Sequence, residues 1–170
     1  MSSCCSTKTE AESKIPQRET GSCPSCATKA KPVATLTVKS LVRDHTKVSP
    51  EESYWFCRQP DCDVIYFSKQ RVFRKPDVKV RVGIKEHEDP IPICYCFEYT
   101  RADISGDLLA RGETDIVNKV KAEVQRGFCA CNVKNPSGAC CLGDITRAIQ
   151  QIKSSHRAEP IPEHNLRREL

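Results

Sequence analysis

The sequence has few aromatic residues and no long hydrophobic run. Aromatic side chains make up 6% of its 170 residues, with one Trp and one Met. So little large apolar material limits the core to one ordinary domain or two small ones. No window approaches the 18 apolar residues that a membrane helix requires, so we expect no membrane span. The N-terminus also lacks the apolar segment of an export signal, which favours a cytoplasmic location.

Positive charge is not concentrated anywhere in the chain. The net charge is +5, from 27 basic and 22 acidic residues. In none of the segments 1–52, 53–93, 94–153 and 154–170 do basic residues exceed acidic ones by more than two. Nucleic-acid-binding proteins gather positive charge on one element, so we expect no nucleic-acid partner. The sequence also contains no glycine-rich phosphate loop, paired-carboxylate site or nucleophile triad, which makes an enzyme the least favoured class.

What the sequence does have is cysteine, at 12 of 170 positions. Disulfides need an oxidising compartment, and the chain shows no signal for export to one. Close-set cysteine pairs without such a signal are more often metal ligands than disulfide partners.

Short β-branched and aromatic runs dominate the first half of the chain. Residues 32–42 predict one or two strands, and residues 53–57 and 64–67 flank a turn in the pattern of a hairpin. Residues 78–84 alternate apolar and polar side chains, which is typical of a strand.

The second half has helical periodicity. Thr100 and Asp103 form a capping-box pattern that predicts the start of one helix. Thr114 could cap a second helix, which would end at Gly127. A third amphipathic helix is predicted by apolar residues at spacings of 3, 4 and 3, namely Leu142, Ile145, Ile149 and Ile152.

These patterns predict an α+β protein with two small lobes. In chain order we expect a disordered leader (1–22), a β lobe (23–88), a linker (89–93), a lobe of about three helices (94–153) and a disordered tail (154–170). Lobes of this size usually need a disulfide or metal to hold them together, and each lobe has its own cysteine group.

The cysteines of the β lobe are spaced like the ligands of a structural zinc site. They form a C-x-x-C and a C-x4-C, each on a predicted turn: Cys23, Cys26, Cys57 and Cys62. Two such turns can complete a closed tetrahedron of thiolates around one zinc ion. A redox C-x-x-C is the alternative for the first pair, but no helix is predicted after it. Asp61 and Asp63 could also ligate, although solvated turn residues are the simpler interpretation.

The helical lobe carries six cysteines, at loops and predicted helix starts: Cys94, Cys96, Cys129, Cys131, Cys140 and Cys141. A [2Fe–2S] cluster needs four cysteinates and is stabilised by N–H donors and by helix N-termini. A C-x-C, a long helical interval and a second pair near a helix start are similar to bacterioferritin-associated ferredoxin and its relatives, which hold such a cluster. Here the later cysteines are separated by the loop 132–139.

Several motifs together resemble the N-terminal domain of CopZ-type copper chaperones, which pair a zinc site with a [2Fe–2S] cluster. The motifs are Cys23-Pro-x-Cys26, Cys57-x4-Cys62-Asp-Val-Ile-Tyr-Phe, Val72-Phe-Arg-Lys, Arg81-Val-Gly-Ile-Lys-Glu, Pro92-Ile-Cys-Tyr-Cys and Asn135-Pro-Ser-Gly-x-Cys-Cys. The resemblance implies zinc ligation by Cys23, Cys26, Cys57 and Cys62, and cluster ligation by Cys94, Cys96, Cys131 and Cys141. Cys141 is preferred because it opens a helix, and Cys129 and Cys140 are the alternates.

The resemblance stops before the copper-carrying part of the family. In those chaperones a βαββαβ unit with an M-x-C-x-x-C loop carries Cu(I). The only Met here is Met1, and no such unit follows residue 153. We therefore expect a version of the iron–sulfur half alone.

The leading hypothesis is a one-electron carrier, or the partner of a metal reductase, in copper or mercury handling. Its partners would be metal ions, a copper or mercury carrier or transporter, and an electron donor. By resemblance, its task could include reducing Cu(II) to Cu(I). One alternative is a direct chaperone for Cu(I) or Hg(II) that uses Cys4 and Cys5, because thiolates select soft metals. Another is a structural adaptor with two zinc sites.

Overall fold

The computed structural model describes residues 20–158. In chain order the strands are β1 (Gly21–Ser22), β2 (Lys29–Val33), β3 (Tyr54–Phe56), β4 (Val64–Phe67), β5 (Val72–Arg74), β6 (Pro92–Cys94) and β7 (Tyr99–Thr100). The helices are α1 (Thr35–Leu41), α2 (Arg101–Arg111), α3 (Ile116–Gln125), α4 (Cys131–Lys134) and α5 (Leu142–Ala158), with 3-10 turns η1 (His45–Lys47), η2 (Lys75–Asp77) and η3 (Gly83–Lys85). The α+β class expected from the sequence is confirmed.

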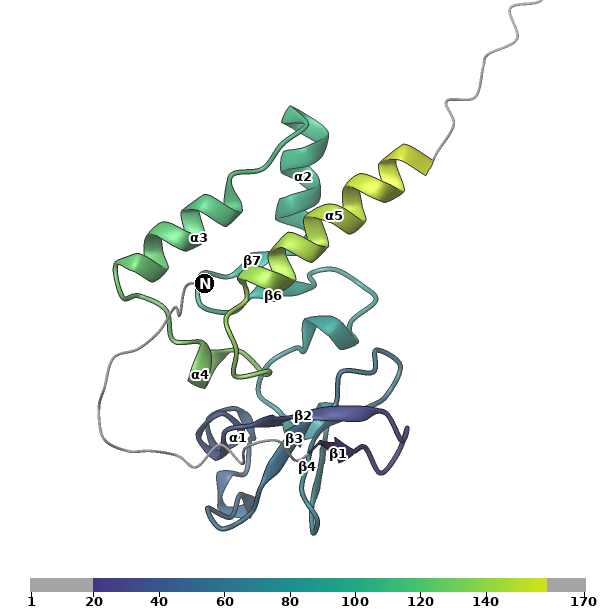
Figure 1. Ribbon diagram of the computed structural model, residues 1–170, viewed down its shortest axis with the longest axis vertical. Helices are drawn as coiled ribbons and strands as arrows, with labels where there is room; N and C mark the ends of the chain where they lie inside the picture. The colour runs from purple at the N-terminus through teal and green to yellow at the C-terminus, as the bar shows by residue number, and fades with distance from the viewer. Residues whose placement is uncertain (1–19, 159–170) are drawn as a thin grey trace, which may run out of the picture.

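Two layers lie one above the other in Figure 1. The lower one contains β1 to β5 and α1, the upper one contains α2, α3 and α5, and the short helix α4 lies between them. The lower sheet is antiparallel, in the order β1-β2-β3-β4-β5. The predicted hairpin is confirmed by the pairing of β3 with β4, where Trp55 lies opposite Phe67.

Residues 35–41 form helix α1, so the prediction that residues 32–42 are strands is wrong beyond Val33. Local β-branched content favoured a strand, but packing decided the conformation. Val38 is fully buried in the core of the lower layer. Thr37, also fully buried, donates its hydroxyl hydrogen to the carbonyl of Asn132 at 2.6 Å. In a helix, Val38 reaches the core of the lower layer and Thr37 reaches the carbonyl of Asn132, contacts that a strand at these positions would not make.

Residues 78–84 do not form the predicted strand either. Their one β-bridge joins Val78 to Val42, and η3 begins at Gly83. Val78 and Val82 are buried, and Val80 is partly buried against the same core. Alternate side chains of any extended segment point to opposite sides. The alternation at residues 78–84 therefore reflects an extended segment that packs on the core without pairing in a sheet.

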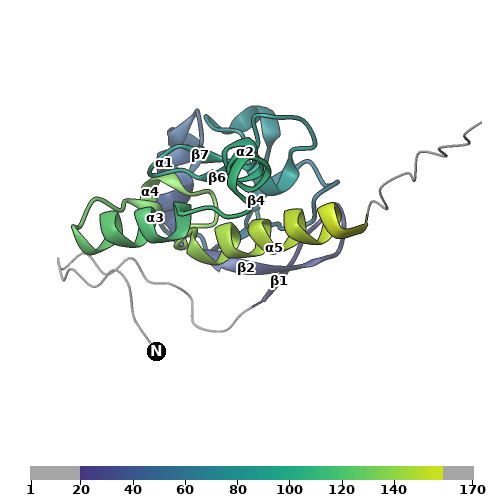
Figure 2. The same ribbon diagram turned by 90° about the horizontal axis from the view of Figure 1, so that it is seen from above.

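The three helices predicted for the second half are present. A fourth, α4, overlaps the expected loop 132–139, and the residue before α3 is Asp115, one position after the expected cap Thr114. Thr100 and Asp103 form a capping box at the start of α2, and Gly127, with φ of 82°, follows α3. Helix α5 contacts both α2 and α3, and Figure 2 shows it from above. Ile104 and Ile145 share one buried core with Cys94 and Cys141.

Three expected boundaries differ from the structure. β1 begins at Gly21 and pairs with β2, so order starts before Cys23. β6 begins at Pro92, inside the expected linker. Helix α5 continues through residues 154–158, where the tail was expected, because neither Gly nor Pro occurs between Gly143 and Pro160. The leader up to residue 19 and the tail from residue 159 lie outside the described residues. Within residues 20–158, no helix is long and apolar enough to cross a membrane.

Candidate metal centres

The first centre is built by two turns of the lower layer. Cys23 and Cys26 belong to a tight turn closed by the bonds from Ala27 N to Cys23 O (2.8 Å) and from Cys23 N to Thr28 O (3.0 Å). Cys57 follows β3, and Cys62 lies two residues before β4. The antiparallel pairing of β3 with β4 therefore brings the two ends of the C-x4-C together beside the first turn.

The four sulfurs have the spacing of a tetrahedral zinc site. Cys23 Sγ lies 3.8 Å from Cys62 Sγ, and Cys26 Sγ lies 3.7 Å from Cys57 Sγ. All four sulfurs lie within 4.8 Å of one another. A tetrahedron with Zn–S bonds of about 2.3 Å has edges of about 3.8 Å, so these side chains fit zinc without rearrangement. The predicted set of four is thus brought together.

Hydrogen bonding and burial shift the pKa values of these thiols in opposite directions. Hydrogen bonds from the side chain and then the backbone of Thr28 lower the pKa of Cys26 to about 6, although burial opposes the shift. Burial raises the pKa of Cys57 to about 12, and burial also raises the pKa of Cys62. Cys26 therefore loses its proton more readily than Cys57 and Cys62.

The alternatives for this centre do not fit the structure. Asp63 accepts two 2.6 Å hydrogen bonds from Arg74, and exposed Asp61 lies 3.4 Å from His87. Neither carboxylate belongs to the group of four sulfurs in the described chain. Strand β2 follows the Cys23–Cys26 turn, in place of the helix that a redox C-x-x-C requires.

The second centre lies between the two layers, where β6, α4 and the start of α5 meet. Cys141 Sγ is 3.0 Å from Cys94 Sγ, and Cys96 Sγ is 3.5 Å from Cys131 Sγ. Cys129 Sγ is 3.2 Å from Cys131 Sγ. Each sulfur of the C-x-C therefore lies against a sulfur of the later segment, 35 or 47 residues along the chain.

The surroundings of this centre favour the thiolate at two of its sulfurs, whereas burial raises the pKa of Cys96 to about 11. The backbone N–H of Ala130 donates to Cys96 Sγ at 3.3 Å. Hydrogen bonding from Cys141 lowers the pKa of Cys131 to about 5 and that of Cys94 to about 7, and it raises the pKa of Cys141 itself. Cys94, Cys131 and Cys141 are buried, and Cys96 and Cys129 are partly buried. A metal group here would be shielded from water on most sides.

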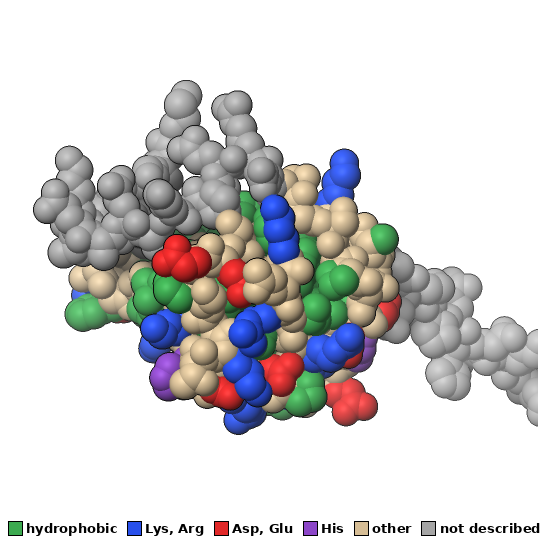
Figure 3. All heavy atoms as spheres, turned by 90° about the horizontal axis from the view of Figure 1, so that it is seen from below, with side chains coloured by type: hydrophobic (Ala, Val, Ile, Leu, Met, Phe, Trp, Pro, Cys, Tyr) green, Lys and Arg blue, Asp and Glu red, His purple; other side chains and the backbone are tan. Residues whose placement is uncertain are grey.

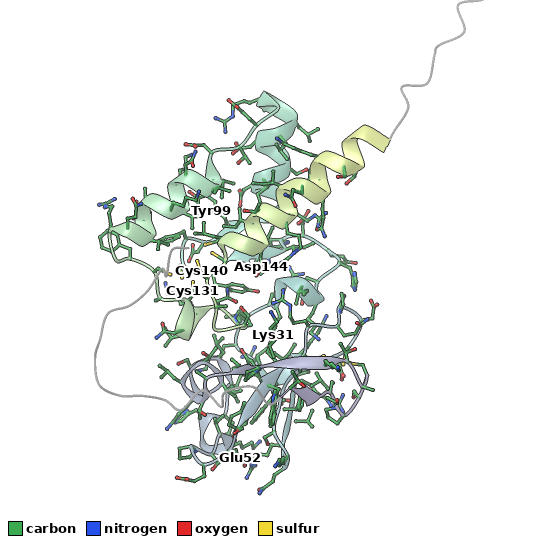
Figure 4. The ribbon with its side chains drawn as sticks, viewed as in Figure 1. Lys31, Glu52, Tyr99, Cys131, Cys140 and Asp144 are labelled. Atoms are coloured by element: carbon green, nitrogen blue, oxygen red, sulfur yellow. The ribbon has the colours of Figure 1, made fainter. Side chains whose placement is uncertain are left out.

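The two alternates differ from the preferred ligands in position. Cys129 joins Cys96 and Cys131 in a group of three sulfurs within 4.8 Å of one another. Cys140 is half-buried, whereas Cys141 is buried beside Cys94. Figure 4 labels Cys131 and Cys140 near α4 and the start of α5, with the lower sheet beneath them. Cys4 and Cys5 lie outside the described residues.

The lower layer holds the segment that carries the later cysteines. The buried hydroxyl of Tyr66 on β4 donates to the carbonyl of Pro136 at 2.7 Å. Thr37 on α1 donates to Asn132 in α4. On the other side, Gly83 N donates to the hydroxyl of Tyr95, which separates Cys94 from Cys96, at 2.8 Å. A Cβ at Gly83 would overlap the carbonyl oxygen of Pro92.

The supporting roles of these residues were not predicted from the sequence. Tyr66 and Tyr95 lie in the motifs Cys62-Asp-Val-Ile-Tyr-Phe and Cys94-Tyr-Cys, next to predicted ligands, and that proximity was the available signal. Their hydrogen-bond partners are 70 and 12 residues away in the chain. No local pattern specifies partners at that separation.

One face of the molecule carries interspersed charges in place of a single charged patch. Figure 3 shows Lys and Arg side chains mixed with Asp and Glu on the face seen from below. Ion pairs also join opposite charges elsewhere in the described chain, such as Arg81 with Glu86 at 2.8 Å and Arg58 with Asp144 at 3.3 Å. This face therefore resembles an ordinary solvated surface.

Comparisons with known proteins agree on one relationship. Residues 20–79 match a family described as the zinc binding domain of CopZ. The copper chaperone CopZ of Archaeoglobus fulgidus is 37% identical over 125 residues, which cover 74% of this chain and 60% of that protein. The X-ray structure of the N-terminal domain of the same chaperone matches with a TM-score of 0.62 and 36% identity, over 74% of this chain and 95% of that domain.

Proposed function

The chain belongs to the family of CopZ N-terminal zinc-binding domains, and from this premise we propose that it is a redox protein of copper or mercury handling. In this proposal zinc bound by the first centre has a structural role. The second centre holds a [2Fe–2S] cluster, which when bound supplies one-electron chemistry. The resemblance that the sequence motifs indicated is confirmed at the level of the family.

For the zinc, we propose Cys23, Cys26, Cys57 and Cys62 as the ligands. The match to a zinc binding domain spans this whole group. The Sγ–Sγ distances of 3.8 Å (Cys23 to Cys62) and 3.7 Å (Cys26 to Cys57) match the edges of a ZnS4 tetrahedron. Four thiolates complete this tetrahedron without a carboxylate or an imidazole.

For the cluster, we propose Cys94, Cys96, Cys131 and Cys141. The observation that carries this proposal is the pairing of each C-x-C sulfur with a later one, at 3.0 and 3.5 Å. In the described chain, no four sulfurs of this centre lie mutually within 4.8 Å. A single tetrahedral ion would require that, so the wider arrangement favours a two-iron cluster over a second structural zinc.

The proposed domains follow the two centres. We place a zinc-binding lobe at residues 23–88 and a cluster-binding lobe at residues 94–153, joined by residues 89–93. The chain spans 60% of the length of the copper chaperone that it matches, so that protein's printed activity extends to this chain only as a proposal. Thiolate ligands and a reducible cluster also suit a reducing compartment such as the cytoplasm.

The test is metal analysis with visible and EPR spectroscopy of protein purified without oxygen. We expect two iron, two sulfide and one zinc per chain, and a colour that dithionite bleaches. Cys94→Ala should remove the iron and the colour but leave the zinc, because Cys94 lies among the cluster sulfurs only. Cys57→Ala is the matched variant and should release the zinc.

Two results would contradict the assignment. If Cys94→Ala keeps both iron and colour, Cys94 is not a ligand. If the unchanged protein holds two zinc and no iron, it is a structural adaptor. Separate Cys129→Ser and Cys140→Ser variants should keep the visible spectrum of the unchanged protein. A changed spectrum in either variant would make that cysteine a cluster ligand in place of Cys131 or Cys141.

A direct soft-metal chaperone is the second candidate. It is favoured by the name of the relative and by the three close thiols of Cys96, Cys129 and Cys131. If Cys4 and Cys5 deliver the metal, a chain beginning at residue 20 should bind Cu(I) more weakly than the full chain. Equal Cu(I) affinity of the two chains would remove those cysteines from the function.

A further inference from the structure

Lys85 is the one lysine that is completely buried among the described residues, with no solvent exposure. It ends η3, the turn between the lower layer and β6. An ammonium removed from water is costly unless opposite charge and hydrogen bonds compensate for it. Its position therefore needs an explanation that the core alone does not give.

The ammonium of Lys85 reaches the loop that carries two of the zinc ligands. Its Nζ donates to the carbonyl of Gln59 at 2.7 Å and to the carbonyl of Cys62 at 3.0 Å. Both acceptors lie in the C-x4-C between Cys57 and Cys62. The backbone of Lys85 is held in turn by Lys75, whose Nζ donates to the Lys85 carbonyl at 2.5 Å. The cation is thus fixed beside the cysteine loop and is not a mobile surface charge.

No carboxylate is paired with Lys85 among the described residues, but the zinc site supplies negative charge. Four thiolates around one Zn²⁺ leave a net charge of about −2. The positive charge of Lys85 already opposes the effect of burial on Cys57, whose pKa burial raises to about 12. The Lys85 ammonium and the negative tetrathiolate therefore stabilise each other fully only when zinc is bound and all four cysteines are thiolates.

We propose that Lys85 is a positioning and charge-compensating residue of the zinc site, which stabilises the tetrathiolate through its cation and fixes the C-x4-C loop through two carbonyls. The role belongs to the zinc-loaded form specifically. Without the metal, Cys57 and Cys62 keep their protons and the buried cation loses most of its counter-charge.

The experiment compares zinc affinities of full-length variants by competition with a chromophoric chelator. Lys85→Met removes the cation and its hydrogen bonds, and Lys85→Gln keeps an N–H donor without the charge. Lys79→Met is the control, because exposed Lys79 also donates to a carbonyl of this lobe, that of Ser40, at 2.8 Å. We expect both Lys85 variants to bind zinc about 10 to 100 times more weakly, the range typical of outer-sphere partners of metal ligands. The control should stay within about threefold of the unchanged protein.

Two outcomes would overturn the proposal. If Lys85→Met binds zinc as tightly as the control, the residue does not act on the site. If Lys85→Gln restores the unchanged affinity, the hydrogen bonds suffice and the charge has no role. Should Lys85→Met fail to fold, Lys85→Gln alone decides between these results. Thermal unfolding of the zinc-free forms is the second measurement. There the Lys85 variants should be no less stable than the unchanged chain. A merely structural role of Lys85 would make the variants less stable both with and without zinc.

Discussion

At the scale of single residues, the cysteines of the zinc site differ in how readily they lose a proton. Thr28 holds the pKa of Cys26 at about 6, whereas burial raises the pKa values of Cys57 and Cys62. All four must be thiolates when zinc is bound. In the metal-free protein at pH 7, these shifts favour a thiolate at Cys26 and protonated thiols at Cys57 and Cys62.

Zinc affinity should therefore rise steeply with pH. Binding at neutral pH must displace at least the protons of Cys57 and Cys62, and each proton displaced changes affinity about tenfold per pH unit. We expect an increase of about 100-fold between pH 6.5 and 7.5, with the affinity lost again as pH falls. Chelator competition at several pH values measures this slope. A change below tenfold per unit would contradict protonated Cys57 and Cys62 in the metal-free protein.

Single residues also mark where local sequence was sufficient. The spacing of Cys23, Cys26, Cys57 and Cys62 predicted a four-sulfur group, and the structure brings those four sulfurs together. A turn places cysteines two to four residues apart on one side, whatever the rest of the chain does. Lys85 had no such signal, because its acceptors are 23 and 26 residues away and only folding brings them near.

At the scale of elements, the segment from α4 to the start of α5 depends on the lower layer. Tyr66 on β4 satisfies the carbonyl of Pro136, and α1 packs against α4. The later cysteines thus keep their positions through contacts with a sheet that carries none of the proposed cluster ligands.

Tyr66→Phe should destabilise the protein by about 1–3 kcal/mol, because it leaves the buried carbonyl of Pro136 without its donor. The cluster should also lose its colour faster in air, since the loop that carries its ligands is less firmly held. Thermal unfolding and visible absorbance over time are the measurements. Tyr99→Phe is the control, because no hydrogen bond of the Tyr99 hydroxyl occurs within residues 20–158, and it should change stability by less than about 0.5 kcal/mol. Equal effects of the two variants would argue against a role for the Tyr66 hydroxyl.

Elements also show where local patterns misled. Residues 35–41 have the composition of a strand, but α1 forms because Thr37 and Val38 are both fully buried on a helix. In contrast, the capping box of Thr100 and Asp103 was predicted and confirmed, since all its interactions span three residues. Prediction succeeded where the deciding contacts were local.

At the scale of the whole molecule, metal sites and apolar cores are parts of the same packing. Cys23, Cys57 and Cys62 share a buried cluster with Trp55 and Phe67. The rings of Trp55 and Phe67 stack with their centroids 5.8 Å apart. Since Trp55 is the only tryptophan in the chain, it reports directly on the packing around the zinc site.

Removing zinc should therefore expose Trp55. A chelator in excess should shift the fluorescence emission to longer wavelength and lower the melting temperature, and added zinc should reverse both. The physical reason is that four thiols without a metal no longer hold the two turns together around this small apolar cluster. Unchanged fluorescence in protein shown to be free of zinc would mean that the lobe is stable without its metal.

The sequence by itself determined which residues could bind metal, where helix α2 begins, and the family to which the chain belongs. Those properties depend on residue types at short spacings, which survive in any compact fold. The tertiary structure decided the helix at residues 35–41, the pairing of Cys94 with Cys141 and Cys96 with Cys131, and the burial of Lys85 beside the zinc loop. Each of these depends on contacts between segments far apart in the chain. Such contacts stabilise the protein only after folding has brought both segments together, at a cost in chain entropy.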